Sequence, residues 1–283
     1  MLRDSLIYPG VSNLYSLRGA IAAFWFNRLW RTGERPARIA IKGTGALVNS
    51  SRGDGTPYLL TANHPFLFQR SALSCGTTAR LGVYESFEAF WDYDGDLTGG
   101  LEHLPRSRGA TLLAADEAND FALLRLHELP AGGRGRTFLG WRAEPVEDRE
   151  LHRISHPHSR PQTYSRHRRL LSGETSDAFD IVGSRCCACR PVELFLHSTI
   201  LEGELGPGSS GAPLVTEDLE IAGQLWGVCE RGGQPFALDG LFTHTYPQVR
   251  GWLDPLGYGR APCLSLQGLE KALGGPEAEP GLD

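Results

Sequence analysis

Apolar residues along the chain occur in short runs separated by Gly, Pro, Asn and Asp. Short runs rich in β-branched and aromatic residues, bounded by such turn residues, are typical of β-strands. The expected strands cover residues 37–41, 45–49, 58–62, 80–84, 88–93, 110–115, 121–126, 137–141, 151–155, 193–197, 213–215, 221–228 and 240–245. Residues 246–253 have a helical pattern that stops before Pro255. The pattern predicts an all-β fold of the sandwich or barrel type with a short C-terminal helix.

The N-terminal segment fits two local structures. Residues 18–24 are compatible with a strand, whereas a helix would place five side chains on one face. These are Leu14, Leu17, Ile21, Phe24 and Arg28. The apolar run at 20–26 is shorter than the core of a signal peptide and has no clear cleavage site. We expect residues 1–35 to be an extension that is part of the folded protein or packs on it.

Composition supports a globular β-protein. The 283 residues are 41% hydrophobic and 22% charged, which suffices for one large or two small cores. The 35 glycines and 18 prolines favour many turns over long helices. A formal net charge of −5 gives no general affinity for nucleic acid, and no apolar run is long enough to span a membrane. We therefore expect neither a nucleic-acid nor a membrane partner.

Two segments look irregular. Residues 149–169 contain many Arg and His residues, so we expect a solvated loop there, with a site for an acidic partner as the alternative. Residues 274–283 are rich in Gly, Pro and Glu, a composition typical of a disordered tail.

The cysteines leave their chemistry open. The six are Cys75, Cys186, Cys187, Cys189, Cys229 and Cys263. Disulfides in an exported protein and buried free thiols in a cytoplasmic one both fit this spacing. The cluster at 186–189 resembles half of a zinc site, but no second pair with suitable spacing follows. We expect no metal.

One loop has the composition required around a nucleophilic serine. Residues 206–215 read Gly-Pro-Gly-Ser-Ser-Gly-Ala-Pro-Leu-Val. Small residues allow a tight turn that exposes a hydroxyl and points backbone N–H groups at the oxygen that gains charge during acyl transfer. Taken alone, an ordinary Gly/Ser-rich loop between two strands fits equally well.

Two further stretches carry possible partners for such a serine. Residues 58–64 form an apolar strand that ends at His64, and Asp120 directly precedes the apolar run 121–126. Imidazole changes protonation near neutral pH, so His64 can act as a general base. A buried Asp120 would accept the second imidazole N–H and hold the ring in the useful tautomer. A surface histidine and a strand-leading aspartate in a turn are the ordinary alternatives.

Together the three stretches, in the order His, Asp, Ser, resemble the trypsin/chymotrypsin family of serine proteases. Within that family the chain is most similar to bacterial lysyl endopeptidases, and the likeness spans about residues 43–255. It is carried by the segments 43–49, 91–93, 140–141, 154–157, 206–213, 223–225 and 252–255.

The resemblance implies two six-stranded antiparallel β-barrels with the active site in the cleft between them. His64 would be the base, Asp120 the orienting acid and Ser210 the nucleophile, with the backbone N–H groups of Gly208 and Ser210 as the oxyanion hole. The expected division is an extension at 1–35, an N-terminal barrel at 36–133, a C-terminal barrel and helix at 134–258, and a tail at 259–283. The family likeness also implies secretion, but no clear signal peptide is present, so the compartment stays open. We expect a monomer that acts on a peptide or protein substrate and needs no cofactor.

The chain departs from the family in two places near these residues. Many members have a cysteine after the histidine, paired with one on an earlier strand, whereas here Pro65 follows His64 and Gly43 stands at the expected partner position. Ser209 stands where trypsin-like zymogens place an aspartate that receives a newly formed N-terminus. A hydroxyl cannot form that ion pair, so we expect activity without a new N-terminal amine.

Residues 224–227 read Gln-Leu-Trp-Gly and resemble the family's strand that pairs with the substrate backbone. We therefore expect Leu225, Trp226 and Gly227 to contact substrate. Gly227 and Gly240 are small, which favours an open pocket.

The pocket acid of lysyl endopeptidases falls near residues 236–238, where this chain has no acid. Glu204, six residues before Ser210, and Asp239 are the remaining candidates for binding a Lys or Arg side chain. The alternative is that both acids face solvent on loop edges.

The expected function is a serine endopeptidase that hydrolyses peptide bonds through an acyl-enzyme, with cleavage after Lys or Arg. The alternative is a catalytically weak or inactive protein of the same fold that binds peptides or proteins.

Overall fold

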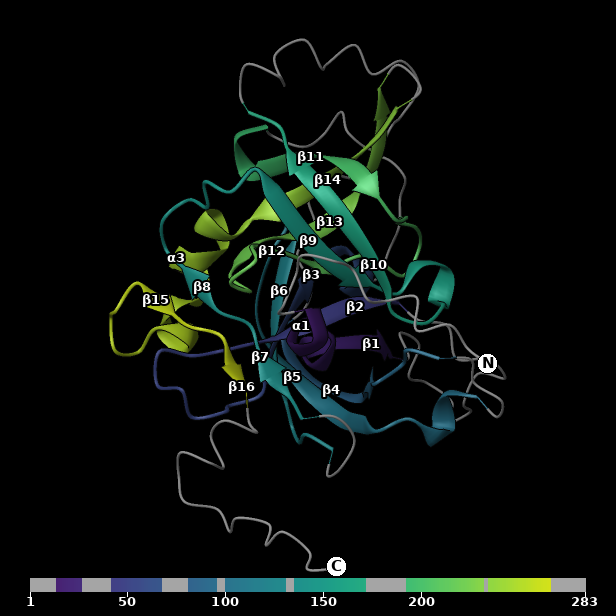
Figure 1. Cartoon of the computed structure of the whole chain (residues 1–283). Coiled ribbons are helices and arrows are strands. Elements are labelled where there is room, and N and C mark those ends of the chain that lie inside the picture. The colour runs from purple at the N-terminus through teal and green to yellow at the C-terminus, as the bar shows by residue number, and fades with distance from the viewer. Residues whose placement is uncertain are drawn as a thin grey trace, which may run out of the picture.

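The computed structural model describes residues 14–26, 42–67, 81–95, 100–130, 135–171, 192–231 and 234–265. Most of its strands form two closed antiparallel barrels of six strands each (Figure 1). The prediction of two six-stranded barrels is thus confirmed, and the fold is chymotrypsin-like. No helix within these residues is long and apolar enough to cross a membrane.

The first barrel has the strand order β1-β2-β3-β6-β5-β4. Its strands are β1 (Ile21–Trp25), β2 (Gly43–Val48), β3 (Tyr58–Ala62), β4 (Gly82–Trp91), β5 (Arg106–Asp116) and β6 (Phe121–Leu126). A helix, α1 (Leu14–Ala20), leads directly into β1. The first barrel therefore begins before residue 36, and the ambiguous N-terminal segment contains both a helix and a strand.

The second barrel has the order β10-β11-β14-β13-β12-β9. Its strands are β9 (Glu150–Ser155), β10 (Thr163–Arg169), β11 (Phe195–Glu202), β12 (Pro213–Val215), β13 (Ile221–Arg231) and β14 (Gln234–Leu241). The helix α3 (Phe242–Leu253) follows β14, so the segment 242–245 is helical and not a strand as predicted. Short strands β7 (Thr137–Phe138) and β8 (Trp141–Arg142) pair with β16 (Leu264–Ser265) and β15 (Arg260–Ala261).

The prediction of a solvated loop at 149–169 is wrong, because β9 and β10 occupy most of it. Successive side chains of a strand point to opposite faces, so alternate polar residues are carried inward. Ser165 and His167 of β10 are wholly buried, whereas Arg166 between them is partly exposed. The expected strand at 37–41 and the expected tail at 274–283 lie outside the described residues.

The two barrels share one apolar core. It joins Leu17 of α1 and Leu60 of β3 to Ile154 of β9 and Phe242 of α3, all nearly or wholly buried. A further cluster, rich in phenylalanine, fills the first barrel, where the Phe26 and Phe66 rings stack with centroids 4.8 Å apart. The shared core fixes how the edges of the two barrels face each other.

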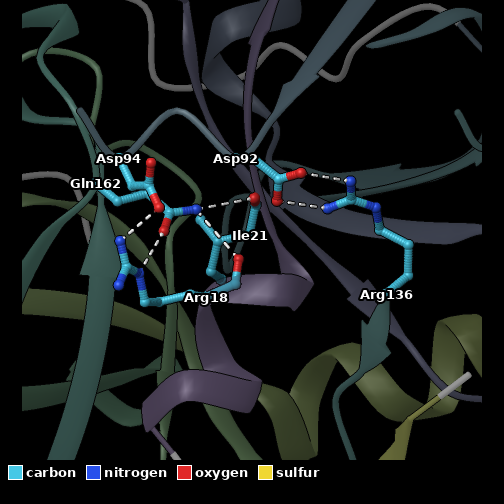
Figure 2. A network of polar contacts seen from close by, with 6 residues as sticks. All are labelled: Arg18, Ile21, Asp92, Asp94, Arg136 and Gln162. Carbon is cyan, nitrogen blue, oxygen red and sulfur yellow. Dashed lines mark hydrogen bonds and ion pairs between the residues drawn. The ribbon is translucent and has the colours of Figure 1, made fainter. Parts of the chain in front are cut away.

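A polar network links α1 and the first barrel to the loop between β9 and β10 (Figure 2). Arg18 forms an ion pair with Asp94 at 2.6 Å, and Gln162 donates to the carbonyl oxygens of Arg18 and Ile21. Beside it, a bidentate pair joins the inter-barrel residue Arg136 to Asp92. The turn after β4 is thereby tied to the N-terminal segment, to the inter-barrel connection and to the second barrel.

Candidate active site

Three side chains lie in line at the junction of the barrels. His64 follows β3, Asp120 precedes β6, and Ser210 lies in the loop before β12. His64 Nδ1 is 2.7 Å from Asp120 Oδ2, and His64 Nε2 is 2.8 Å from Ser210 Oγ. Because Nδ1 faces a carboxylate, it carries the ring proton and leaves Nε2 to accept from the serine hydroxyl. This arrangement can take a proton from Ser210 as the hydroxyl attacks a carbonyl.

Both oxygens of the Asp120 carboxylate contact His64. Its Oδ1 accepts the backbone N–H of His64 at 2.9 Å, while its Oδ2 meets the ring. The Asp120 side chain is 1% exposed and that of His64 is 21% exposed. The acid is therefore shielded from water, and the imidazole remains accessible.

The turn that carries Asp120 is anchored from the second barrel. Asp120 has a φ of 57°, a left-handed conformation that is uncommon for a non-glycine residue. Its neighbour Asn119 donates to the Thr245 hydroxyl of α3 at 2.9 Å, and the Asn119 carbonyl accepts from the Gln224 side chain. These contacts hold a strained turn in place.

The loop before β12 presents two backbone N–H groups without internal acceptors. Among the described residues, neither Gly208 N–H nor Ser210 N–H has a hydrogen-bond partner. Gly208 has a φ of 98°, and a Cβ there would lie 2.5 Å from the carbonyl oxygen of His156. Only glycine fits this position, which exposes the N–H groups expected of an oxyanion hole.

Ser209 is buried and bonded inside the second barrel. Its Oγ lies 3.0 Å from Ser155 Oγ and accepts the Gly206 N–H at 3.3 Å. Ser209 stands where trypsin-like zymogens have an aspartate. Here a pair of neutral hydroxyls, those of Ser209 and Ser155, occupies this position next to Ser210.

The expected substrate strand is part of β13. The ladder between β12 and β13 ends at Gln224, while the ladder with β14 continues to Arg231. Leu225 uses both its backbone groups internally, with Ala212 and Gly211. A Cβ at Gly227 would meet nothing within 4 Å among the described residues. Leu225 is thus engaged within the barrel, and open space lies beside Gly227.

Glu204 lies at a surface cavity of about 400 Å³. The cavity is lined by Ile200, Leu201, Glu202, Gly203, Glu204, Leu205, Val228 and Pro235. The Glu204 side chain is half exposed and pairs with the equally exposed Arg160. Exposed pairs of this kind contribute little free energy, so a charged ligand can compete for the carboxylate.

Asp239 does not line an accessible pocket. Its side chain is 0% exposed and pairs with Arg153, which is also 0% exposed. Burial raises the pKa of the Asp239 carboxyl, and the guanidinium of Arg153 partly offsets this. Gly240 was expected to leave a substrate pocket open. Instead, the backbone of Asn119 approaches it closely, since a Cβ at Gly240 would lie 1.9 Å from the carbonyl oxygen of Asn119. We therefore assign neither residue to substrate binding.

The cysteine alternatives are partly resolved. Cys229 of β13 is disulfide-bonded, and Cys263 is a free thiol. Burial raises the pKa of the Cys263 thiol to about 11. The cluster at 186–189 and Cys75 lie outside the described residues. Within the described ranges, no group of three or more His, Cys, Asp or Glu side chains could hold a metal ion.

Sequence reasoning missed the residues that support the site from a distance. Thr44, Ser155 and Gln224 contact the loops that carry the three aligned side chains, and Asn119 anchors one of those loops from within. Their signal in the sequence is weak. Each is a polar residue within or beside an apolar strand, where an unpartnered polar group would be costly to bury.

The double barrel with His64, Asp120 and Ser210 at its junction is the architecture of a chymotrypsin-like protease. The sequence pattern of the family "Lysyl endopeptidase, C-terminal domain" matches residues 37–235, well over half of the chain. The chain belongs to this family, and a protease acts on peptide bonds.

Solved structures of the Rv3671c protease of M. tuberculosis are also similar to this chain. Its active form is 16% identical over 87% of this chain and 85% of that one, with a TM-score of 0.49. A mutant in an inactive form is 15% identical over 91% of this chain and 96% of that one, with a TM-score of 0.48.

Proposed function

We propose that the protein is a serine endopeptidase that works through an acyl-enzyme. The observation that carries the proposal is the position of the His64 ring, within 2.8 Å of both Asp120 and Ser210. No cofactor is required by this chemistry.

In the proposed reaction, Ser210 Oγ attacks the scissile carbonyl while His64 Nε2 takes the hydroxyl proton. Asp120 stabilises the imidazolium, and the N–H groups of Gly208 and Ser210 bind the oxyanion. The imidazolium then protonates the leaving amine. Water, deprotonated by the same histidine, releases the acyl group and restores the serine.

The experiment uses a fluorophosphonate probe and a peptide library on the full chain. We expect labelling and cleavage by the wild type, and loss of both in Ser210→Ala. His64→Ala should lower kcat by at least about 10⁴-fold, because members of such a triad act as a unit. Ser51→Ala is the matched control, because Ser51 lies between β2 and β3 and its hydroxyl accepts the Leu256 N–H. A wild type without labelling would instead favour a peptide-binding protein of the same fold.

We further propose cleavage after Lys or Arg, with Glu204 as the acid that binds the substrate's charge. The cavity beside it offers the apolar side chains of Ile200, Leu201 and Val228 to the long aliphatic stem of such a residue. A charge-assisted hydrogen bond supplies about 1.5–3 kcal/mol.

Rates on peptides that differ only at the residue before the cut test this specificity. We expect Glu204→Gln to lower kcat/KM for Lys and Arg peptides by about tenfold or more, and to leave that for a norleucine peptide unchanged. Equal rates for Lys and Phe peptides in the wild type would reject basic specificity, and the proposed catalytic roles of the three aligned residues would still stand.

A further inference from the structure

Thr44, on the second strand of the first barrel, contacts the loop that carries Ser210. Its Oγ1 donates to the carbonyl oxygen of Gly208 at 2.8 Å, and its backbone N–H donates to the carbonyl oxygen of Ser210 at 2.8 Å. Thr44 therefore forms hydrogen bonds with both ends of the three-residue segment 208–210. It belongs to the barrel that carries His64, not to the barrel that carries Ser210.

The hydrogen bonds of the Thr44 hydroxyl have a single consistent direction. A threonine hydroxyl has one proton to donate and two lone pairs to accept with. Both the backbone N–H and Nδ1 of His156 approach Thr44 Oγ1, at 3.1 and 3.2 Å. The Gly208 carbonyl oxygen can only accept, so the hydroxyl proton must point to it. His156 then carries its own proton on Nδ1 and supplies the second donor.

His156 keeps this arrangement at neutral pH. Its ring is wholly buried and stacks on Tyr93 with centroids 5.7 Å apart. Burial lowers the pKa of His156 to about 3, so the ring is neutral. Its Nε2 has no hydrogen-bond partner among the described residues, as expected for an unprotonated acceptor atom.

The bonds around the loop hold nearly every peptide plane that orients the two free N–H groups. The carbonyl of Pro207, in the plane that carries Gly208 N–H, accepts from His158 N–H at 2.6 Å. Thr44 holds the planes after Gly208 and after Ser210. The plane between Ser209 and Ser210, which carries Ser210 N–H, is held through the Ser209 carbonyl oxygen, which accepts from Ala212 N–H at 3.0 Å. Thr44 fixes the planes on both sides of it, so the loop shape that places Ser210 N–H depends on the Thr44 contacts together with this bond.

The approach of β2 to this loop is close. A Cβ added at Gly43 would lie 2.8 Å from the carbonyl oxygen of Ser210, and one at Gly211 would lie 2.6 Å from the carbonyl oxygen of Thr44. Thr61 of β3 in turn donates to the Thr44 carbonyl at 2.8 Å. The anchor is therefore built into the sheet of the first barrel and has little room to shift.

The geometry points to Thr44 as a positioning residue that holds the loop at residues 206–211, which carries the proposed oxyanion-hole N–H groups, in its working shape. The inference rests on the proposed endopeptidase function. Thr44 touches neither the substrate nor the reacting atoms, and its effect is transmitted through the orientation of Gly208 and Ser210. The hydroxyl of Ser155, bonded to Ser209, supports the middle of the same loop.

The test compares Thr44→Val, which removes the hydroxyl and keeps the shape, with Thr44→Ser, which keeps the hydroxyl. Thr216→Val is the matched control, because Thr216 is also buried and its hydroxyl accepts a backbone N–H, from Glu220, in a distant turn. Two readouts are used. These are kcat and KM on a cleavable peptide, and hydrogen exchange of the peptide that covers residues 206–212.

We expect Thr44→Val to lower kcat by about ten- to a hundredfold with KM changed far less, because misplaced donors lose transition-state binding. Hydrogen exchange in residues 206–212 should be faster in Thr44→Val but not in Thr216→Val. In Thr44→Ser, both kcat and the exchange rate should stay close to the wild-type values. The inference would be overturned if Thr44→Val had the same exchange rate and kcat as the wild type. It would also be overturned if Thr216→Val lost as much kcat and protection as Thr44→Val. A wild type without peptidase activity would reject the proposed function, while the exchange rates would still decide whether Thr44 orders the loop.

Discussion

The two barrels have the same strand number but differ in how many polar side chains they bury. The first is filled by a cluster rich in phenylalanine and leucine, with Phe24, Phe66 and Phe87 packed together. The strands of the second carry buried charge and imidazole. Arg153 pairs with Asp239, and His167 bonds to the hydroxyls of Ser165 and Ser198. One closed sheet is thus held by apolar packing, and the other depends heavily on polar partners.

This difference separates two tasks within one site. The first barrel carries His64 and Asp120 at its edge, and polar contacts of Asn119 with the second barrel anchor the turn at Asp120. The second barrel carries Ser210 and its loop, which is held by the Ser155 hydroxyl and, from the first barrel, by Thr44. Buried polar groups strongly penalise partners that are missing or misplaced, so they favour one arrangement of the loop.

The largest expected effect is on the buried ion pair. Asp239→Ala leaves the Arg153 guanidinium buried without its partner, and should lower the free energy of unfolding by about 3–5 kcal/mol. The double variant Arg153→Met with Asp239→Leu replaces both charges by apolar groups and should recover most of that loss. Urea unfolding of the two variants measures the difference. Equal stability of the single variant and the wild type would contradict a charged interior.

A fall in pH should weaken the second barrel before the first. Burial lowers the pKa values of His152, His156, His167 and His197, and for His167 the charges of Arg153 and His152 add to the effect. The unfolded chain takes up protons below pH 6.5 and the folded chain does not, so stability falls as pH decreases from 6.5 toward the folded pKa values. For His156 alone the loss between pH 6.5 and 5 is about 2 kcal/mol.

Hydrogen exchange at pH 7.5 and pH 5 distinguishes the two barrels. We expect peptides from β9 and β10 to lose protection at pH 5 while those from β2 and β3 keep theirs. The variant His127→Gln is the control, because His127 is an exposed residue that directly follows β6 of the first barrel. Simultaneous loss of protection in both barrels would show that they open as one unit.

The smallest expected effect is on the surface pair of the second barrel. Arg160 and Glu204 are each about half exposed, so Arg160→Ala should change the free energy of unfolding by less than about 1 kcal/mol. Thermal unfolding of Arg160→Ala and Asp239→Ala, measured side by side, compares the contribution of an exposed ion pair with that of a buried one. A loss as large as that of the buried pair would contradict the role assigned here to burial.

Much of the fold could be predicted from local pattern. The apolar runs at 58–62, 121–126 and 213–215 coincide with β3, β6 and β12. The pattern did not settle β1, because its residues are buried on both faces and lack alternation. It also missed β10, where Arg and His residues alternate between the interior and the surface. A polar strand of this kind has no apolar signal for the sequence to reveal.

The candidate site divides in the same way. His64, Asp120 and Ser210 each follow or precede an apolar strand, so short stretches of sequence pointed to them. Asp239 is buried in an ion pair that the sequence did not indicate, because its partner Arg153 lies on another strand, 86 positions away. Thr44 was not identified at all, since its contact with Gly208 spans 164 positions.

By itself the sequence determined the strand pattern, the order of the three aligned residues and the small residues around Ser210, because these depend on neighbours along the chain. The tertiary structure alone decided which buried polar groups pair, that the second barrel has a charged interior, and that a threonine of one barrel holds the loop of the other. Those choices depend on packing between distant strands, and a linear sequence does not record which side chains will face each other.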